Sequence, residues 1–400
     1  MRAKGTVGKL AALTAVSMGA ATAWRFSRSA PPREDPACRD RLESRAESFV
    51  TADGVRLKLR RYANEGAQPV LFAHGFNGNG LEFDLPHREH NLALFLAERG
   101  YDVWISSFRG CGREPYVCDS GGWGHSIDHL AALDAPALVA GVRGATGRKP
   151  IWIGHSMGGV VLYMFLQGVT ISGGGLRVTA DPELARERND SILGGITIGS
   201  PPGLHCGGGD WIAKLERLPF FEQIARLLVR VLDRAGETSP RVPVSRIGSF
   251  TERFPRLGRL LAMRGPIAIF LYNAKNVYPD VGYSLLKWAS DNVTTRMAAQ
   301  FVALGLDPDF KDYNGGYNYT ANMSSITAPI FFITGTEDFA GPDNVREYGY
   351  EKVSSRVRRF ENYRDYGHTD LVMGKRVYHE VYPDILEWIE GLAAGQALKS

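Results

Sequence analysis

The amino-acid sequence predicts an α/β fold, in which a doubly wound, mostly parallel sheet carries an inserted helical cap. Three observations predict this fold. Short apolar runs alternate with helical stretches, one long segment interrupts the alternation, and a Gly-x-Ser-x-Gly motif joins an apolar run to a helical one. The chain of 400 residues, 44% hydrophobic and 22% charged, has an ordinary globular composition and is long enough for a large core with an added subdomain.

The amino terminus carries an apolar run, Leu10 to Trp24, with basic residues on both sides. A basic start, a short apolar stretch and small residues near its end are typical of a secretory signal peptide, whereas basic residues after the run favour an uncleaved anchor. The run is short for a membrane span, which takes about 20 apolar residues, so a packed or disordered helix is the alternative. We expect residues 1–25 to be a signal peptide or membrane anchor, which makes the protein secreted or membrane-attached, and residues 26–46 to be a linker.

The core is expected to start at residue 47 with a hairpin that turns at Asp53-Gly54, because the apolar residues from Val55 to Leu59 alternate with basic ones. Five nearly continuous apolar runs follow, as is typical of parallel strands buried on both faces. They are Pro69 to Ala73, Tyr101 to Ser106, Pro150 to Gly154, Ile192 to Ile198 and Pro329 to Thr334.

Helical stretches separate these strands and make the alternation that a doubly wound sheet requires. They are Asn91 to Arg99, His129 to Val142 and Gly158 to Gln167. A weaker strand, Arg356 to Phe360, and a final amphipathic helix from about Val377 to Leu392 complete the core, which spans residues 47–199 and 325–400.

Residues 200–324 lack the alternation of strand and helix. Two amphipathic, basic stretches occur there, Pro219 to Arg234 and Phe254 to Tyr272. We expect this segment to form a helical cap or lid over the carboxyl edge of the sheet. Each apolar face either packs on neighbouring helices or belongs to a mobile lid that meets a lipid substrate or a membrane surface.

Ser156 is the candidate nucleophile. It lies in Gly154-His155-Ser156-Met157-Gly158, directly after an apolar strand and directly before a helical run. That context is a nucleophile elbow, a strained turn that pushes the serine Oγ out at the head of the sheet. Glycines are needed two residues before and after the serine, because side chains there would clash with each other and with neighbouring backbone.

An oxyanion formed during attack on an ester needs fixed N–H donors. Met157, which follows the nucleophile and opens a helix, offers one backbone N–H group. The second is expected from Phe76, in the loop His74-Gly75-Phe76 after the first parallel strand, where Gly75 lets the chain turn. A simple glycine turn is the alternative interpretation of this loop.

His368 is the candidate base among nine histidines, because it lies in a loop between the last weak strand and the final helix, whereas His379 falls inside that helix. Asp338, directly after the strand PIFFIT, is the candidate acid, with Glu337 and Asp343 as alternates. The order serine, aspartate, histidine is that of α/β hydrolases.

The motifs HGFNGNG, GYDVWISSFRG, GHSMGG, TGTED and YGHTD together resemble the α/β-hydrolase superfamily, over about residues 47–392. Three stretches also resemble the acid-lipase group of lysosomal and gastric lipases: NLALFLAERGYDVWISSFRGCGRE, the helix with Asp134-Ala135-Pro136-Ala137, and GTEDFAGPDNV. The chain departs from that group at Ser107-Phe108-Arg109-Gly110, where the group commonly has Asn before Ser-Arg-Gly, and at Met157, where it commonly has Gln. The resemblance implies ester hydrolysis without a metal or organic cofactor.

We therefore expect a serine hydrolase that cleaves carboxylic esters of lipid or other apolar acyl groups through an acyl-enzyme on Ser156. The alternative is an acyltransferase or polyester-synthase-like enzyme on the same fold, although such synthases usually carry a cysteine nucleophile. A binding-only protein would not need a complete triad, and epoxide or haloalkane chemistry would need an acidic nucleophile.

Other classes lack their sequence signals. There is no G-x-G-x-x-G after a strand for a dinucleotide and no HExxH or comparable cluster for a metal. The net charge of +4 comes without a basic, aromatic-rich stripe for nucleic acid. Four cysteines (Cys38, Cys111, Cys118 and Cys206) form no CxxC pair, and Cys111 and Cys118 either bridge a short loop in an exported protein or are free thiols.

Overall fold

The computed structural model describes Cys38 and residues 42–172, 177–205, 221–238, 241–264, 271–304 and 306–395. The expected signal peptide or anchor (residues 1–25), most of the expected linker and Cys206 lie outside the described residues. Within these ranges, none of the helices combines the length and the hydropathy that crossing a membrane would require.

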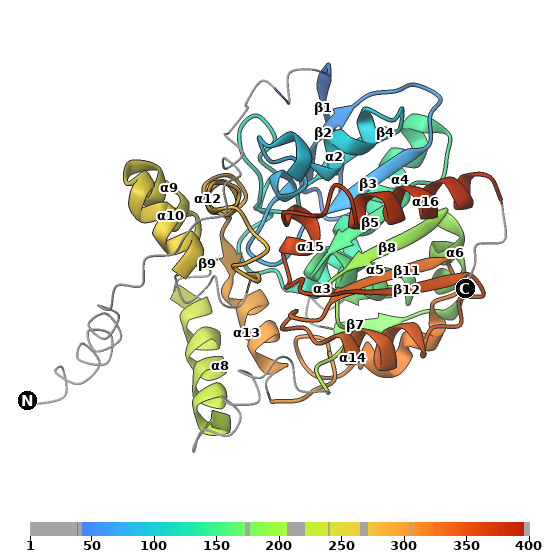
Figure 1. The fold of residues 1–400 in the computed structure, drawn as a ribbon. Helices are drawn as coiled ribbons and strands as arrows, with labels where there is room; N and C mark the ends of the chain where they lie inside the picture. Colours follow the sequence, from blue (N-terminus) through green and yellow to red (C-terminus); the bar gives the residue numbers. More distant parts are fainter. Residues whose placement is uncertain are drawn as a thin grey trace, which may run out of the picture. The chain divides into compact units, whose positions relative to one another are not determined.

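Eight strands form one sheet in the order β1-β2-β4-β3-β5-β8-β11-β12 (Figure 1). They are β1 (Ser44–Val50), β2 (Arg56–Tyr62), β3 (Pro69–Ala73), β4 (Asp102–Ser106), β5 (Ile151–His155), β8 (Gly194–Ile198), β11 (Ile330–Gly335) and β12 (Arg358–Tyr363). Strand β2 is antiparallel to both of its neighbours, and all pairings from β4 to β12 are parallel. The doubly wound, mostly parallel sheet predicted from the sequence is confirmed.

The hairpin of β1 and β2 turns at Gly54, where a backbone φ of +84° suits glycine. Strand β1 starts earlier than the expected core, because Ser44 still pairs with Tyr62, so the end of the expected linker is part of the sheet. Two short strands that the sequence pattern did not indicate, β6 (Val169–Ser172) and β7 (Arg177–Ala180), pair with each other in an antiparallel sheet.

Helices cover both faces of the sheet. They are α2 (Leu92–Ala97), α3 (Ile127–His129), α4 (Ala135–Thr146), α5 (Met157–Leu166), α6 (Pro182–Ser191), α14 (Pro342–Val345), α15 (Asp370–Met373) and α16 (Val381–Ala393). Successive strand residues point to opposite faces, and in β3 Leu71 packs in the core shared with α4 and α5, whereas Val70 and Phe72 pack in the core shared with α2 and α16. Burial on both faces explains why these strands read as continuous apolar runs.

Helices also fill the described part of the chain between β8 and β11, which we call the cap segment (residues 221–303). They are α8 (Phe221–Thr238), α9 (Ser245–Arg253), α10 (Pro255–Arg264), α12 (Pro279–Trp288) and α13 (Thr295–Ala303), with a short strand pair of β9 (Arg241–Val242) and β10 (Val293–Thr294). Helix α8 packs on α13, and α9 and α10 pack on α12 (Figure 1). In α13, Gln300 Nε2 donates to Asp128 Oδ1 of the core at 2.9 Å. The limits of a cap domain at residues 200 and 324 stay predictions.

Candidate active site

Ser156 lies in a strained turn between strand β5 and helix α5. Its φ of 51° and ψ of −117° form a backbone conformation that non-glycine residues rarely adopt. The Ser156 N–H group donates to the Ile198 carbonyl of β8 at 2.8 Å, which fixes the turn to the sheet. Strand, strained serine and helix together make the elbow geometry that exposes a serine Oγ at the end of a sheet.

The glycines of the motif are required by close contacts, with backbone at Gly154 and Gly158 and with side chains at Gly159. A Cβ atom on Gly154 would lie 2.4 Å from the carbonyl carbon of Gly158. One on Gly158 would lie 2.0 Å from the Ala73 carbonyl oxygen, and one on Gly159 would lie 2.2 Å from Ser200 Oγ. Helix α5 therefore sits directly against β5 and the end of β3, as the sequence argument on clashing side chains requires.

Asp338 and His368 lie in contact at the carboxyl ends of two adjacent parallel strands, β11 and β12. His368 Nδ1 lies 2.8 Å from Asp338 Oδ1, with the two side chains 4% and 0% exposed. Asp338 Oδ1 also accepts the Ala340 N–H group at 2.8 Å, which holds the carboxylate in place. An imidazole that donates from Nδ1 presents Nε2 as a proton acceptor.

The alternates named from the sequence lie elsewhere. Glu337 and Asp343 are exposed, and so is His379, whose ring packs on Tyr378.

His155 lies between the Ser156 turn and the His368 loop at one edge of the sheet. It directly precedes Ser156, and the centroid of its ring lies 4.8 Å from that of the His368 ring. Among the described residues no hydrogen bond joins the Ser156 hydroxyl to His368; such bonds often tighten only when substrate binds.

Gly199, directly after β8 with a φ of +57°, makes room for the side chains of Asp338 and His368. A Cβ atom there would lie 2.9 Å from Asp338 Oδ2 and 3.0 Å from His368 Nδ1.

The two expected oxyanion donors come from segments that touch each other. Met157 is the first residue of α5, so its N–H group has no acceptor within the helix and lies at the positive end of the helix dipole. Phe76 follows Gly75, at which a Cβ atom would lie 3.3 Å from Ser156 Cβ. The next residue, Asn77, has a φ of +54°, so the loop after β3 turns sharply beside the serine.

The side chain of His74 stabilises this loop through two hydrogen bonds. Its Nε2 atom accepts the Phe108 N–H group at 3.0 Å, so Nδ1 carries the proton and donates to the Gly75 carbonyl at 2.8 Å. Burial lowers the pKa of His74, which keeps the ring neutral.

Arg109 fixes the loop that follows β4. Its guanidinium group is 2% exposed and binds Asp134 through Nε at 2.8 Å and Asp53 through Nη1 at 2.8 Å. These two ion pairs connect the turn between β1 and β2, the Ser107–Gly110 loop and the start of α4. Two of the residues that carry the acid-lipase resemblance, Arg109 and Asp134, are thus structural.

Glu82 was missed by the sequence analysis, and His155 was interpreted only as part of a turn. Glu82 ends a 3-10 helix (Gly80–Glu82), is 6% exposed, and accepts the Gly75 N–H group through Oε1 at 2.9 Å. The same oxygen lies 3.3 Å from Nδ1 of His155. The available signal was a pair of carboxylates, Glu82 and Asp84, that alternate with apolar residues directly after HGFNGNG.

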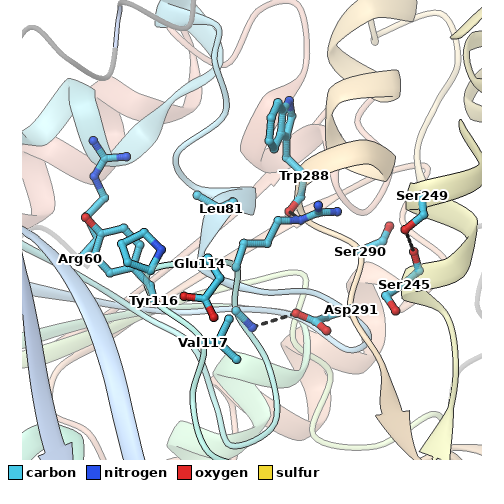
Figure 2. A pocket seen from close by; sticks show the side chains of 13 residues that line it. Arg60, Leu81, Glu114, Tyr116, Val117, Ser245, Ser249, Trp288, Ser290 and Asp291 are labelled. Carbon is cyan, nitrogen blue, oxygen red and sulfur yellow. Dashed lines mark hydrogen bonds between the residues drawn. The ribbon is translucent and has the colours of Figure 1, made fainter. Parts of the chain in front are cut away.

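A cavity of about 680 Å³ lies between the loop that follows Gly110 and the cap segment (Figure 2). Asp291 stands in its wall, where Oδ2 accepts the Gly112 N–H group at 2.8 Å, and the Asp291 N–H group donates to the Asn77 carbonyl at 2.8 Å. The cavity therefore adjoins the loop of Phe76, but its lining includes none of the candidate catalytic side chains.

Cys111 and Cys118 are buried free thiols, and Cys38 is also buried. Over the described ranges, no group of three His, Cys, Asp or Glu side chains is placed to hold a metal ion.

Comparison with known proteins finds a match to the model of the alpha/beta hydrolase family over residues 70–376. A stretch of 127 residues is 35% identical to triacylglycerol lipase 2 of Arabidopsis thaliana, covering 28% of this chain and 30% of that lipase. A stretch of 151 residues is 31% identical to gastric triacylglycerol lipase of Homo sapiens, covering 34% of this chain and 35% of that lipase. The matches thus span about a third of the length of these curated relatives.

Among solved structures, the chain is similar to an esterase from Exiguobacterium antarcticum, with a TM-score of 0.52 and 14% identity over 86% of this chain and 98% of that one. Similarity at that identity concerns the fold.

Proposed function

Because the chain belongs to the alpha/beta hydrolase family, we propose that it is a serine hydrolase that cleaves carboxylic esters through an acyl-enzyme on Ser156. The observation that carries this proposal is the buried contact between Asp338 and His368 at the sheet edge that also presents Ser156 in a strained turn. Triacylglycerol lipases among the relatives support the same chemistry.

In the proposed mechanism His368 Nε2 takes the proton of the Ser156 hydroxyl while Oγ attacks the ester carbonyl carbon. Asp338 keeps the imidazole in the tautomer that can accept this proton and stabilises the imidazolium that forms. The N–H groups of Phe76 and Met157 bind the oxyanion of the tetrahedral intermediate. The imidazolium then gives its proton to the departing alcohol, and a water molecule, deprotonated by His368, hydrolyses the acyl-enzyme. No cofactor enters this scheme.

The proposed substrates are small esters with apolar, lipid-like acyl groups. Exposed apolar side chains on the cap segment support contact with a lipid surface. Seven of the eight most exposed large hydrophobic side chains in the described ranges lie on or next to α8, α9 and α10, between 40% and 59% exposed. They are Leu227, Leu228, Val231, Phe250, Phe254, Leu257 and Leu260.

Exposed arginines lie among these apolar residues, at positions 226, 230, 234, 256, 259 and 264. A basic amphipathic surface suits an interface with anionic lipid. Such contact agrees with secretion or membrane attachment through residues 1–25, which we retain as part of the proposal.

Hydrolysis of p-nitrophenyl esters of increasing acyl length, with and without detergent micelles, tests the proposal. We expect turnover that rises with chain length and increases at the micelle surface, and that falls on the order of 10³-fold or more in Ser156→Ala. Wild-type turnover that is unchanged in Ser156→Ala would contradict the proposal. Ester product formed from an added alcohol faster than free acid would instead support the alternative, an acyltransferase or polyester-synthase-like enzyme.

A further inference from the structure

The carboxylate of Glu82 lies inside the loop that is proposed to bind the oxyanion. Its Oε1 atom accepts the Gly75 N–H group at 2.9 Å. Its Oε2 atom would be 3.1 Å from a Cβ atom on Gly78, which is tighter than ordinary contact, so this glycine leaves room for the carboxylate. The position of Phe76 therefore depends on a buried acid.

His155 fills the space between this carboxylate and His368. Its side chain is 3% exposed, its Nδ1 atom lies 3.3 Å from Glu82 Oε1, and its ring lies 4.8 Å from the ring of His368. Neither ring nitrogen of His155 makes a well-angled hydrogen bond to a described residue. Charge and ring packing therefore hold this side chain in place.

The charges around His155 favour its protonated form. Burial alone lowers the pKa of His155, but the carboxylate of Glu82 and, more weakly, the charge of Asp338 outweigh burial and raise the pKa above its ordinary value. The other titratable groups facing the ring are the imidazoles of His74 and His368. A buried anion next to an oxyanion site would oppose the negative charge that develops there, and a protonated His155 offsets it.

We propose that Glu82 and His155 are positioning residues of the esterase reaction. Glu82 holds the oxyanion loop through the Gly75 N–H group, and His155 pairs with Glu82 and packs its ring against the ring of His368. This inference rests on the proposed function, because it assigns Ser156, Asp338 and His368 their catalytic roles. The buried ion pair of Glu82 and His155 connects the oxyanion loop, the serine turn and the His368 ring.

Two substitutions separate charge from shape. Glu82→Gln keeps an oxygen that can accept the Gly75 N–H group but removes the negative charge that favours the protonated form of His155. His155→Asn removes the positive charge beside His368 and leaves Glu82 charged. Glu89→Gln is the matched control, because Glu89 is exposed and lies in the next turn of the same loop.

The readout is the pH dependence of kcat/KM for a short p-nitrophenyl ester, together with kcat and KM at the pH optimum. A positive charge about 5 Å from the base opposes its protonation, so removing that charge should move the acid limb to higher pH by about one unit. We expect the largest shift in His155→Asn, a smaller one in Glu82→Gln and none in Glu89→Gln. We also expect Glu82→Gln to lower kcat by about tenfold with little change in KM, since the oxyanion site matters in the transition state.

An acid limb that stays at the wild-type pH in both variants would overturn the proposal, whether or not activity falls, because a structural role alone does not move it. If Glu82→Gln does not fold, which thermal unfolding would reveal, His155→Asn decides the result, because the shorter amide leaves Glu82 in place. Ser156→Ala run in parallel separates the two proposals. If hydrolysis depends on Ser156 but the acid limb of the pH profile does not move in the Glu82 and His155 variants, only the positioning roles of Glu82 and His155 are refuted. If hydrolysis does not depend on Ser156, the proposed function is refuted.

Discussion

Asp338→Asn tests the assignment of the acid most sharply, because the amide keeps the size of the side chain and removes its charge. Asp338 Oδ1 lies 2.8 Å from His368 Nδ1 in a site that is closed to solvent. Two unit charges about 4 Å apart at an effective dielectric constant of about 20 attract each other by about 4 kcal/mol. Losing that attraction when the imidazolium forms lowers the rate on the order of 10³-fold. An amide that donates to Nδ1 would also select the tautomer that cannot take the serine proton, which adds to the loss.

The assay is kcat/KM for a short p-nitrophenyl ester at mildly alkaline pH, with thermal unfolding as the check on folding. Glu337→Gln and Asp343→Asn are the matched controls, since both side chains are exposed and both were alternates for the acid. We expect Asp338→Asn to lose about three orders of magnitude and the two controls to stay within about twofold of the wild type. Asp338→Asn that keeps more than about a tenth of the activity, or a control that loses it, would refute this assignment.

Three further predictions concern other parts of the molecule. Gly158→Ala should lower the melting temperature and the activity together, because its Cβ atom would lie 2.0 Å from the Ala73 carbonyl oxygen. Overpacking of this kind costs about 1–3 kcal/mol or more. The control Gly144→Ala, which has no atom within 4 Å of its Cβ atom, should be neutral or stabilising in thermal unfolding. Burial lowers the pKa of His90 from 6.5 to about 4, so between these two pH values the unfolded chain binds more protons than the folded one. The free energy of unfolding should therefore fall as the pH drops from 6.5 toward 4. His90→Gln should flatten this dependence in urea titrations. Leu227→Ser combined with Leu260→Ser should weaken sedimentation with vesicles of phosphatidylglycerol and leave turnover of a soluble ester unchanged; equal vesicle binding by variant and wild type would contradict the lipid contact proposed for the cap segment.

Much of the fold could be predicted because its strands are buried on both faces and so appear as uninterrupted apolar runs. The paired strands β6 and β7 could not be predicted, since Thr170 and Thr179 lie on their exposed side and leave no apolar pattern. Strand β1 extends to Ser44 although its residues are mostly polar, because edge pairing with β2 rather than burial holds it.

In the candidate site, the loops of Ser156, Asp338 and His368 could be predicted because each follows a parallel strand, and such strands deliver their carboxyl ends to one edge. The contact of Asp338 with His368 agrees with that reasoning, whereas the catalytic roles of all three residues stay predictions.

Glu82 could not be predicted in the same way. It lies in a short 3-10 helix, and only the folded loop shows that its carboxylate turns back to the Gly75 N–H group and meets His155. Long-range pairing of this kind, like that of Asp291 with Asn77, is set by the packing of segments that no local pattern connects.

The most direct test of the account is to label the folded, full-length protein with a fluorophosphonate and to map the modified residue by peptide mass spectrometry. A serine activated by His368 reacts with this probe, whereas ordinary surface serines do not. We predict a single stoichiometric adduct on Ser156 that disappears in His368→Ala. An adduct on another residue, or an unlabelled Ser156 in the folded protein, would contradict the central claim.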